Sequence, residues 1–370
     1  MKKLAFLALS ASLAAVLTTL PAAAHKLATQ STQGERRLAG ISSSFMIDME
    51  RLIAQWSLYA FTEPVHEEIT NRIYGCDGDR KVCAGAAALT APVPVLAGVR
   101  WNDDPPFRMT ASQASGTKCK VSETIRFETQ PTCWATLFMD ASKGASRGKQ
   151  YGPGDAMLYR THFGDLQFLH AMATRDGELA RDTKARVMGW FEFTWRTAQG
   201  EYNLDTRLKE IDNPTIQAAF GHTEWRVLDL FTQGASGGLR RSVDDVAFGS
   251  LLHTLQDSYA EGHVNREESS GTRKCAAAGI SVEAPGAIQE FHAYNHQDHS
   301  AHAQADTRAA FLLRVQEPGD VVEVGRALLA ARDRKLPWNE VLPLLDCALA
   351  LHREDAPAIP GDRFAKTQLP

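Results

Sequence analysis

Beyond its first 25 residues the sequence has no apolar run long enough to span a membrane. The first run follows Lys2 and Lys3 and is roughly fifteen residues long, short of the ~20 residues that cross a bilayer. It ends at Pro21 and three alanines. This layout predicts a secretory signal peptide at residues 1–24, cleaved after Ala24, with a membrane anchor as the alternative. We therefore expect a secreted or periplasmic protein.

The sequence also lacks an excess of basic residues. It contains 40 Lys and Arg against 44 Asp and Glu, which gives a formal net charge of −4. Loss of Lys2 and Lys3 with the signal peptide changes the net charge from −4 to −6. A mildly acidic chain without a basic stripe is poorly suited to a nucleic-acid backbone or an anionic membrane. We therefore expect no nucleic-acid partner.

Linkers, repeats and low-complexity tracts are absent, so nothing in the composition divides residues 25–370. Alternating, strand-like runs are scarce, and 121–129 is the best of them. Most long segments carry apolar residues at three- and four-residue spacing, which is typical of helices with one buried face. The sequence therefore predicts an all-α fold with long loops at 76–160 and 264–290. The predicted helical segments are 44–61, 184–201, 215–233, 244–261 and 338–352.

Six cysteines in an exported chain indicate disulfides, because the compartment outside the cytoplasm is oxidising. Short separations favour two local pairs and leave a third, which gives Cys76–Cys83, Cys119–Cys133 and Cys275–Cys347. The sequence does not exclude the other pairings.

Histidine is clustered, since half of the twelve histidines lie between His253 and His302. In HTLQDSYAEGH, His253 and Asp257 are four residues apart, so a helix would place them on one face one turn apart. Gly262 would end or bend that helix and turn His263 back toward them. Imidazole nitrogen and carboxylate oxygen are both good zinc ligands. For a single pair of this kind, a solvated helix face is the alternative.

A second pair with the same spacing weakens that alternative. His302 and Asp306 are also four residues apart, and the pair closes a histidine-rich tract, FHAYNHQDHSAH. The other histidines of this tract lie at helical spacing and are either competing ligands or exposed side chains, namely His292, His296 and His299.

Three earlier stretches contain the same residue types. His162 in RTHFGDLQFLH lies near Asp165 and two phenylalanines. Asp103 in GVRWNDDPPF is followed by two prolines, which hold this acidic segment in a rigid loop. His66 lies near the start of a helix in TEPVHEEIT, which is not the HExxH motif of zinc proteases because position 70 is not histidine. Taken singly, the His162 and Asp103 stretches are also explained by turns with solvated acids.

In this order along the chain, the motifs resemble the zinc-dependent phospholipase C family, whose superfamily also contains the single-strand-specific zinc nucleases. The family pattern is an early His, an Asp in an aromatic-rich loop, a His-Phe segment, a His-x3-Asp-x5-His helix and a final His-x3-Glu or His-x3-Asp. The chain looks most similar to the Pseudomonas-type secreted phosphatidylcholine phospholipases. The matching residues here are His66, Asp103, His162, His253, Asp257, His263, His302 and Asp306.

The resemblance implies a single-domain, monomeric enzyme with two to three zinc ions. Its first ion would be held by Asp103, His162, His253 and Asp257. Its second ion would be held by His263, His302 and Asp306, and a third by His66 with Asp257 as the bridge. Asp103 would also help to deprotonate the attacking water. The implied substrate is a phospholipid at a membrane or micelle surface, cleaved to diacylglycerol and a phosphorylated head group.

Two features depart from the family pattern. In the family the mature amino terminus, commonly a tryptophan, ligates the third zinc. Signal cleavage here would expose His25, and Trp56 lies further along the chain, so residues 25–55 would be a propeptide or an N-terminal extension. The insert 264–301 before His302 is also longer than in the family. The third zinc site and the choice of ligands in the histidine tract therefore stay open.

Two other functions use the same residues. A zinc nuclease or other phosphoesterase of the superfamily would keep the metals and cleave single-stranded nucleic acid or another ester. A non-enzymatic periplasmic protein would bind metal without activating water. The phospholipase hypothesis predicts that His253→Ala abolishes activity and lowers the metal content. His170 lies outside the assigned ligands, so His170→Ala is predicted to do neither.

Overall fold

The computed structural model describes residues 26–28, 30–42, 44–55, 62–78, 83–84, 90–233 and 237–366. About half of the chain is helical and the sheets are small, which confirms the predicted mainly helical fold. Within the described ranges, no helix is both long enough and apolar enough to cross a membrane. The predicted signal peptide, His25 and Trp56 lie outside the described residues.

The elements of the first half of the chain are α1 (Gln33–Ala39), α2 (Phe45–Gln55), α3 (Val65–Ile73), α5 (Val93–Val99), α6 (Ala111–Ala114), α7 (Pro131–Ala145), α8 (Met157–Phe163), η1 (Gln167–His170) and α9 (Ala180–Ala198). Next come η2 (Leu208–Glu210), α10 (Pro214–Phe220), α11 (Val227–Thr232), α12 (Gly237–Arg240) and α13 (Val243–Asp257). The last part contains β1 (Val264–Arg266), β2 (Lys274–Ala277), β3 (Ile280–Glu283), β4 (Ile288–Phe291), η3 (Tyr294–His296), α14 (His299–Ala305), α15 (Arg308–Arg314), α16 (Val321–Asp333) and α17 (Trp338–Ala348).

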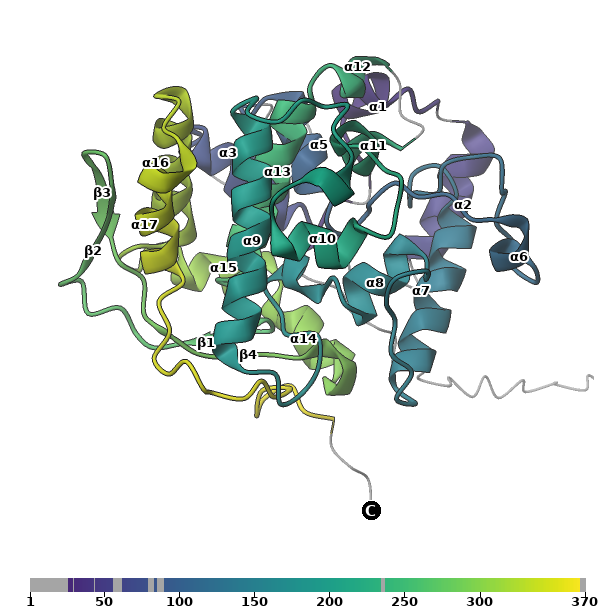
Figure 1. Ribbon diagram of the computed structural model, residues 1–370. Helices are drawn as coiled ribbons and strands as arrows, with labels where there is room; N and C mark the ends of the chain where they lie inside the picture. The colour runs from purple at the N-terminus through teal and green to yellow at the C-terminus, as the bar shows by residue number, and fades with distance from the viewer. Residues whose placement is uncertain are drawn as a thin grey trace, which may run out of the picture.

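Helix α13 lies in the middle of the molecule and packs against α5 and α9 (Figure 1). Two glycines let α5 and α13 touch through their backbones. A Cβ at Gly98 would lie 2.2 Å from the Val246 carbonyl oxygen, and a Cβ at Gly249 would lie 2.1 Å from the Val95 carbonyl oxygen. Because His253 is about one turn beyond Gly249, this close approach brings its ring to the end of α5.

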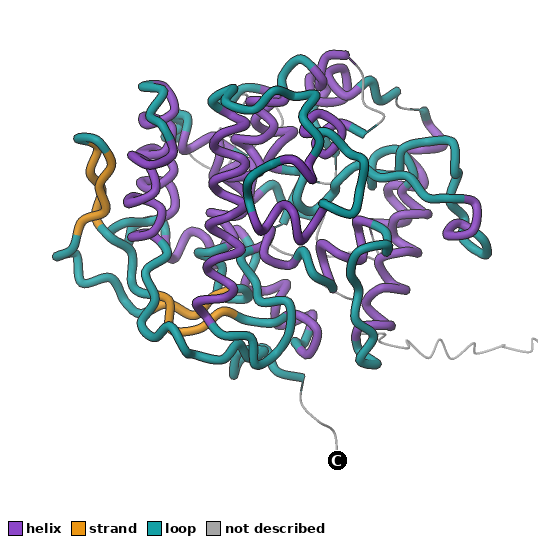
Figure 2. Tube along the Cα trace, viewed as in Figure 1, coloured by secondary structure: helices purple, strands orange, loops and turns teal. Residues whose placement is uncertain are grey.

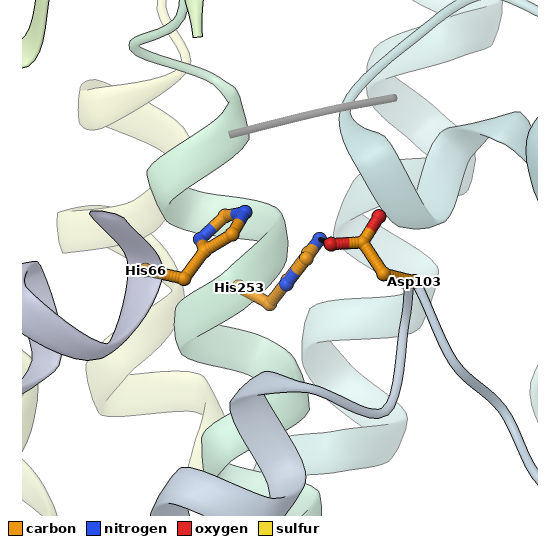
Figure 3. Close-up of side chains that lie close together, drawn as sticks. All are labelled: His66, Asp103 and His253. Atoms are coloured by element: carbon orange, nitrogen blue, oxygen red, sulfur yellow. Dashed lines mark ion pairs between the residues drawn. The ribbon is translucent and has the colours of Figure 1, made fainter. Parts of the chain in front are cut away.

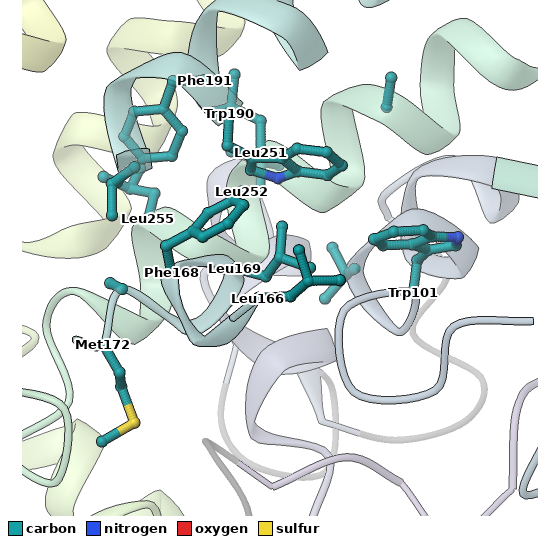
Figure 4. Close-up of a cluster of buried hydrophobic side chains, with 14 of the residues drawn as sticks. Trp101, Leu166, Phe168, Leu169, Met172, Trp190, Phe191, Leu251, Leu252 and Leu255 are labelled. Atoms are coloured by element: carbon teal, nitrogen blue, oxygen red, sulfur yellow. The ribbon is translucent and has the colours of Figure 1, made fainter. Parts of the chain in front are cut away.

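The hydrophobic core surrounds α13 on every side. All residues from Val246 to Asp257 are buried, so this part of the helix has no solvated face. Trp101 and Trp190 stack with their ring centroids 5.7 Å apart, and leucines of α13 pack beside them (Figure 4). The alternative interpretation of His253 and Asp257 as a solvated helix face is therefore wrong.

Several predicted boundaries differ from the structure. The segment 215–233 forms two helices, α10 and α11, because the first helix ends at Gly221 and Thr223 turns back to bond the Phe220 carbonyl. The segment 244–261 leaves the helix at Ser258 and continues as turns.

The two predicted long loops also contain regular structure. Residues 76–160 include α5, α6, α7 and the start of α8, and Pro131 begins α7 at a first-turn position that suits proline. The segment 121–129 pairs only through one bridge, between Phe107 and Ile125, and is not a strand. The insert 264–301 forms two antiparallel pairs, β1 with β4 and β2 with β3 (Figure 2).

Three disulfides join the predicted cysteine pairs, Cys76–Cys83, Cys119–Cys133 and Cys275–Cys347. The third bond ties β2 of the insert to α17 and so fixes the insert to the helical body. Three disulfides are consistent with an extracellular or periplasmic protein.

Candidate metal centre

Buried histidines and aspartates from distant parts of the chain converge at the end of α13. His66 of α3, His253 of α13 and Asp103 of the segment after α5 point toward one another (Figure 3). Their exposed fractions are 0%, 0% and 1%. Close packing of α5 on α13 explains the convergence, because Asp103 follows α5 by only four residues.

Asp257 stands at the centre of the first group of ligand atoms. Its Oδ2 lies 2.9 Å from His170 Nδ1 and 3.0 Å from His253 Nε2, and these two nitrogens are 3.2 Å apart. Ligand atoms around a tetrahedral zinc ion with bonds of ~2.0–2.1 Å are about 3.3 Å apart. The triangle formed by the three side chains is therefore close to one face of a tetrahedral site.

Two further side chains extend this group. The second oxygen of Asp257, Oδ1, lies 3.4 Å from His66 Nε2, so one carboxylate faces histidines on both sides. Asp103 approaches the same two histidines that contact Asp257 Oδ2. Its Oδ1 lies 3.8 Å from His170 Nδ1 and its Oδ2 lies 4.0 Å from His253 Nε2. This arrangement suits a carboxylate that bridges two cations.

A second group lies next to the first and consists of His263, His302 and Asp306. His302 Nε2 is 3.1 Å from Asp306 Oδ2, and His263 Nε2 is 3.8 Å from Asp306 Oδ1. The two groups adjoin, because His263 Nδ1 is also 3.8 Å from Asp257 Oδ2. All three side chains are at most 1% exposed.

Backbone and amide oxygens fix the orientation of the histidine rings. An oxygen acceptor on Nδ1 places the ring proton there and leaves the Nε2 lone pair free for a metal. Such acceptors lie 2.6 Å from Nδ1 of His66, His253 and His263 and 2.7 Å from Nδ1 of His302. They are Gln256 Oε1, the Val99 carbonyl, the His170 carbonyl and Gln297 Oε1, respectively.

The orientation of Gln297 is determined by its other contacts. Its Nε2 donates to the carbonyl oxygens of Gly262 and Pro360, both at 2.7 Å. Because a carbonyl oxygen can only accept, Gln297 Oε1 must face His302. His302 therefore presents Nε2 to the site.

Several buried polar atoms of the centre lack a hydrogen bond within the described chain. Leaving such a group without a partner costs ~1–3 kcal/mol, so native proteins rarely do it without a ligand. These atoms are Asp103 Oδ1, His170 Nε2, His263 Nε2, His302 Nε2 and both carboxylate oxygens of Asp306. Nitrogen and carboxylate donors of this kind fit a divalent metal, and zinc suits them well.

Burial also sets the protonation of the ring nitrogens. It lowers the pKa of His170 and His253 to about 4 and that of His302 to about 3. Burial alone would also lower the pKa of His66, but the hydrogen bond and charge of Asp257 outweigh it and raise this pKa to about 9. At neutral pH the first three rings are therefore neutral and can bind a metal, whereas His66 must first lose a proton.

The three carboxyl groups of the centre differ in the direction in which their pKa values are shifted. Burial opposes ionisation of Asp257, but the charges of His253 and His263 hold its pKa well below the usual range. Burial raises the pKa of Asp306 to about 8 and that of Asp103 well above its usual value. Without a metal, Asp257 is therefore the carboxyl group of the centre that ionises most readily.

His162, a predicted ligand, lies at the edge of the centre. Its Nε2 donates to the backbone carbonyl of Asp103, 2.9 Å away. The ring stacks on His170 with a centroid separation of 5.3 Å and shares a potential metal group with His170 and Asp103. Asp165, noted beside it in the sequence, pairs with Arg160 at 2.7 Å and is not in the centre.

His170, which has no assigned role in the sequence-based ligand set, lies inside the candidate centre. It belongs to two of the potential metal groups among the described residues. The short helix η1 brings it back over α13, eight residues after His162. Both histidines lie in RTHFGDLQFLH, so the stretch was recognised but its second histidine was not chosen.

The structure also settles which residue of the histidine tract joins the centre. Among the described residues, only His302 of the tract belongs to a potential metal group. His292 Nδ1 bonds the Gly262 carbonyl, His299 Nε2 lies 3.4 Å from Ser142 Oγ, and the largely exposed His296 pairs with Asp176.

Tyr294 is a second residue that sequence reasoning missed. Its ring lies edge-on to His302 with centroids 4.9 Å apart, and its buried hydroxyl has no hydrogen bond within the described chain. Burial raises the pKa of this hydroxyl well above the usual value, and the charges of Asp306 and Asp103 add to the effect. The group is therefore a neutral hydrogen-bond donor near both carboxylates.

Lys26, the first described residue, lies directly against the centre. Its carbonyl accepts hydrogen bonds from the backbone N–H groups of Val65 and His66, and its own N–H donates to the Asp306 carbonyl at 3.4 Å. Lys26 therefore lies beside the candidate metal centre.

Comparisons with known proteins give no relative: no family model, curated protein or solved structure matches the chain.

Proposed function

We propose that the protein is a secreted zinc phospholipase C that hydrolyses phosphatidylcholine-like lipids to diacylglycerol and a phosphorylated head group. The observation that carries the proposal is the position of Asp257, whose two oxygens face His66 on one side and His170 and His253 on the other. The His263, His302 and Asp306 group adjoins it. Closely spaced cation sites of this kind are typical of enzymes that cleave phosphate esters.

Each ion has a set of ligands under this proposal. The first would be held by His170, His253, Asp257 and Asp103, the second by His263, His302 and Asp306, and a third by His66 and Asp257. Bound zinc ions would lower the pKa of water and neutralise charge on a phosphate. His162 would orient Asp103 through the hydrogen bond to its backbone carbonyl.

Two side chains have roles in handling the substrate. Asp103 would accept the proton of the attacking water, because its carboxylate lies beside the ligand atoms of the first ion. The Tyr294 hydroxyl donates a hydrogen bond to a phosphate oxygen, since nothing in the described chain accepts from it.

One observation favours a second candidate, a non-enzymatic metal-binding protein. The metal ligands are at most 5% exposed, and a cavity of 490 Å³ beside α14 is lined by Ala301, Ala305 and Phe364 rather than by the ligands. A structural metal site is closed to solvent, whereas a catalytic site keeps one position for substrate or water.

Hydrolysis before and after metal removal distinguishes the candidates. The purified protein is assayed on phosphatidylcholine and on single-stranded DNA, then treated with a chelator, and zinc is restored. The proposal predicts phosphocholine release that the chelator abolishes and zinc restores. Bound metal without either activity would favour the non-enzymatic protein, and cleavage of DNA alone would favour a nuclease.

A further inference from the structure

Helix α2 carries an unbroken apolar face that points away from the protein. Five of the ten large hydrophobic residues exposed within the described chain lie on this one helix: Phe45 at 77%, Met46 at 67%, Met49 at 41%, Leu52 at 50% and Ile53 at 65%. At about 100° per residue these five positions fall within an arc of about 120°. No charged residue lies inside the arc.

The opposite face holds α2 firmly to the body. Arg51 is completely buried, donates to the Glu128 carbonyl at 3.0 Å and pairs with Asp48 at 2.9 Å. Ala54 is 5% exposed on the same side, and the helix packs against α7. The apolar face is therefore presented by an anchored helix.

The dimensions of the face argue against a second copy of the chain as its partner. A helix of 11 residues is about 16 Å long and about 10 Å wide. Even if all five side chains were fully covered, two such faces would bury on the order of 1,100 Å² of accessible surface in total, whereas stable protein interfaces bury about 1,200–2,000 Å². This face alone therefore falls short of a stable dimer interface.

The charged residues beside the apolar face indicate which kind of surface it can bind. On a helical projection the arc is bordered by Asp48 on one side and Glu50 on the other, and no basic residue lies on it. Helices that bind anionic lipids have Lys and Arg in these bordering positions. The surface that matches this helix therefore has an apolar interior and head groups without net charge, as a zwitterionic phospholipid layer has.

We propose that α2 inserts its apolar face into the surface of a zwitterionic phospholipid membrane and so holds the protein on its substrate. This inference rests on the proposed function. It gives α2 a role that the catalytic residues do not supply, namely attachment to the interface where the lipid resides. Insertion of five large apolar side chains to the depth of the acyl boundary is the usual basis of such attachment.

The helix is also coupled to the metal centre through α7. Inner side chains of α7, Trp134 and Phe138, contact the His162 ring with centroid separations of 5.9 Å and 5.1 Å. The order α2, α7, His162 therefore connects the lipid-binding helix to the centre, with one helix, α7, between α2 and the His162 ring.

Co-sedimentation with phosphatidylcholine vesicles tests the inference. The zinc-loaded protein is compared with the double variant Leu52→Ser, Ile53→Ser, whose residues are half exposed or more and so contribute little to folding. We expect vesicle binding to weaken at least about ten-fold, because two large side chains no longer insert. The control variant is Leu342→Ser, at an exposed position of α17. Helix α17 lies on the other side of the molecule from α2 in Figure 1, so this variant should bind as the wild type does.

The remaining outcomes separate this inference from the proposed function. Hydrolysis of dispersed short-chain phosphatidylcholine should be unchanged in the double variant, and vesicles containing phosphatidylserine should bind less protein. If no hydrolysis is found but vesicle binding still depends on α2, the proposed phospholipase activity is wrong and the proposed lipid binding by α2 is supported. Equal binding by the double variant, or a dimer in light scattering that the double variant abolishes, would overturn the inference.

Discussion

Asp257 Oδ2 and His170 Nδ1 lie 2.9 Å apart in the buried centre of the molecule. The contact joins η1 to the end of α13 across 87 residues of sequence. It makes His170 an inner residue of the metal centre, on the same carboxylate oxygen that faces His253.

His170→Ala should therefore lower the zinc content by about one ion per chain. It removes a nitrogen donor from the tetrahedral face formed with His253 and Asp257, and loss of one protein ligand weakens a zinc site strongly. Metal analysis by mass spectrometry checks this. His222→Ala is the matched control, since His222 is exposed and belongs to no potential metal group among the described residues. Equal zinc contents in the two variants would show that His170 is not a zinc ligand.

Zinc binding should release protons at pH 7. Asp306 with a pKa of about 8 and His66 with a pKa of about 9 are largely protonated without metal, and both must lose their protons to become ligands. Calorimetry in buffers of different ionisation enthalpy measures the number released. We expect at least one proton per chain at pH 7 and a smaller number at pH 9. A number that rises with pH would contradict these protonation states.

The metal-free protein should lose stability as the pH rises from 7 to 9. Asp306 and His66 have higher pKa values in the folded protein than their ordinary values of 3.8 and 6.5, so the folded state binds more protons in this range. The contribution is present below the ordinary values and is lost as the pH passes 8 and 9. Each group contributes at most about 1.4 kcal/mol per pH unit. Urea unfolding at several pH values tests the sign, and zinc should weaken the dependence.

Gly262→Ala should impair the second metal group selectively. A Cβ at Gly262 would lie 2.8 Å from His302 Nδ1, and so would push the ring away from Gln297 and Asp306. We expect lower zinc content with only a modest loss of stability. Gly152→Ala is the matched control, because nothing lies within 4 Å of a Cβ there. Full zinc content in Gly262→Ala would show that His302 tolerates the displacement.

The helical content and the two local disulfides could be predicted from the sequence, because periodic apolar residues and short cysteine separations are local signals. Cys275–Cys347, with a separation of 72, followed only as the remaining pair. The boundary at Gly221 and the helix α7 were missed, since both depend on turn bonds and packing. Spacing of four residues correctly placed His253 with Asp257 and His302 with Asp306 on shared helical faces. Proximity of His170 to Asp257 could not be predicted, because it depends on how η1 folds back over α13.

The choice between His302 and its neighbours likewise required the structure. Helical spacing treats His299 and His302 alike, and only the packing of Gly262 and Gln297 shows which ring faces His263. Tyr294 carried no signal in the sequence, because a lone tyrosine is most often a core residue. The burial of α13 from Val246 to Asp257 could not be predicted either, since it depends on the helices that surround it.

The central claim is that the cluster around Asp257 binds metal ions, and native mass spectrometry of the purified protein counts them directly. We predict two to three zinc ions per chain in the wild type, and the loss of at least one in Asp257→Asn, which keeps the shape of the side chain and weakens the bridge. A wild-type protein that binds no metal, or an Asp257→Asn variant that binds the same number of ions, would contradict the account.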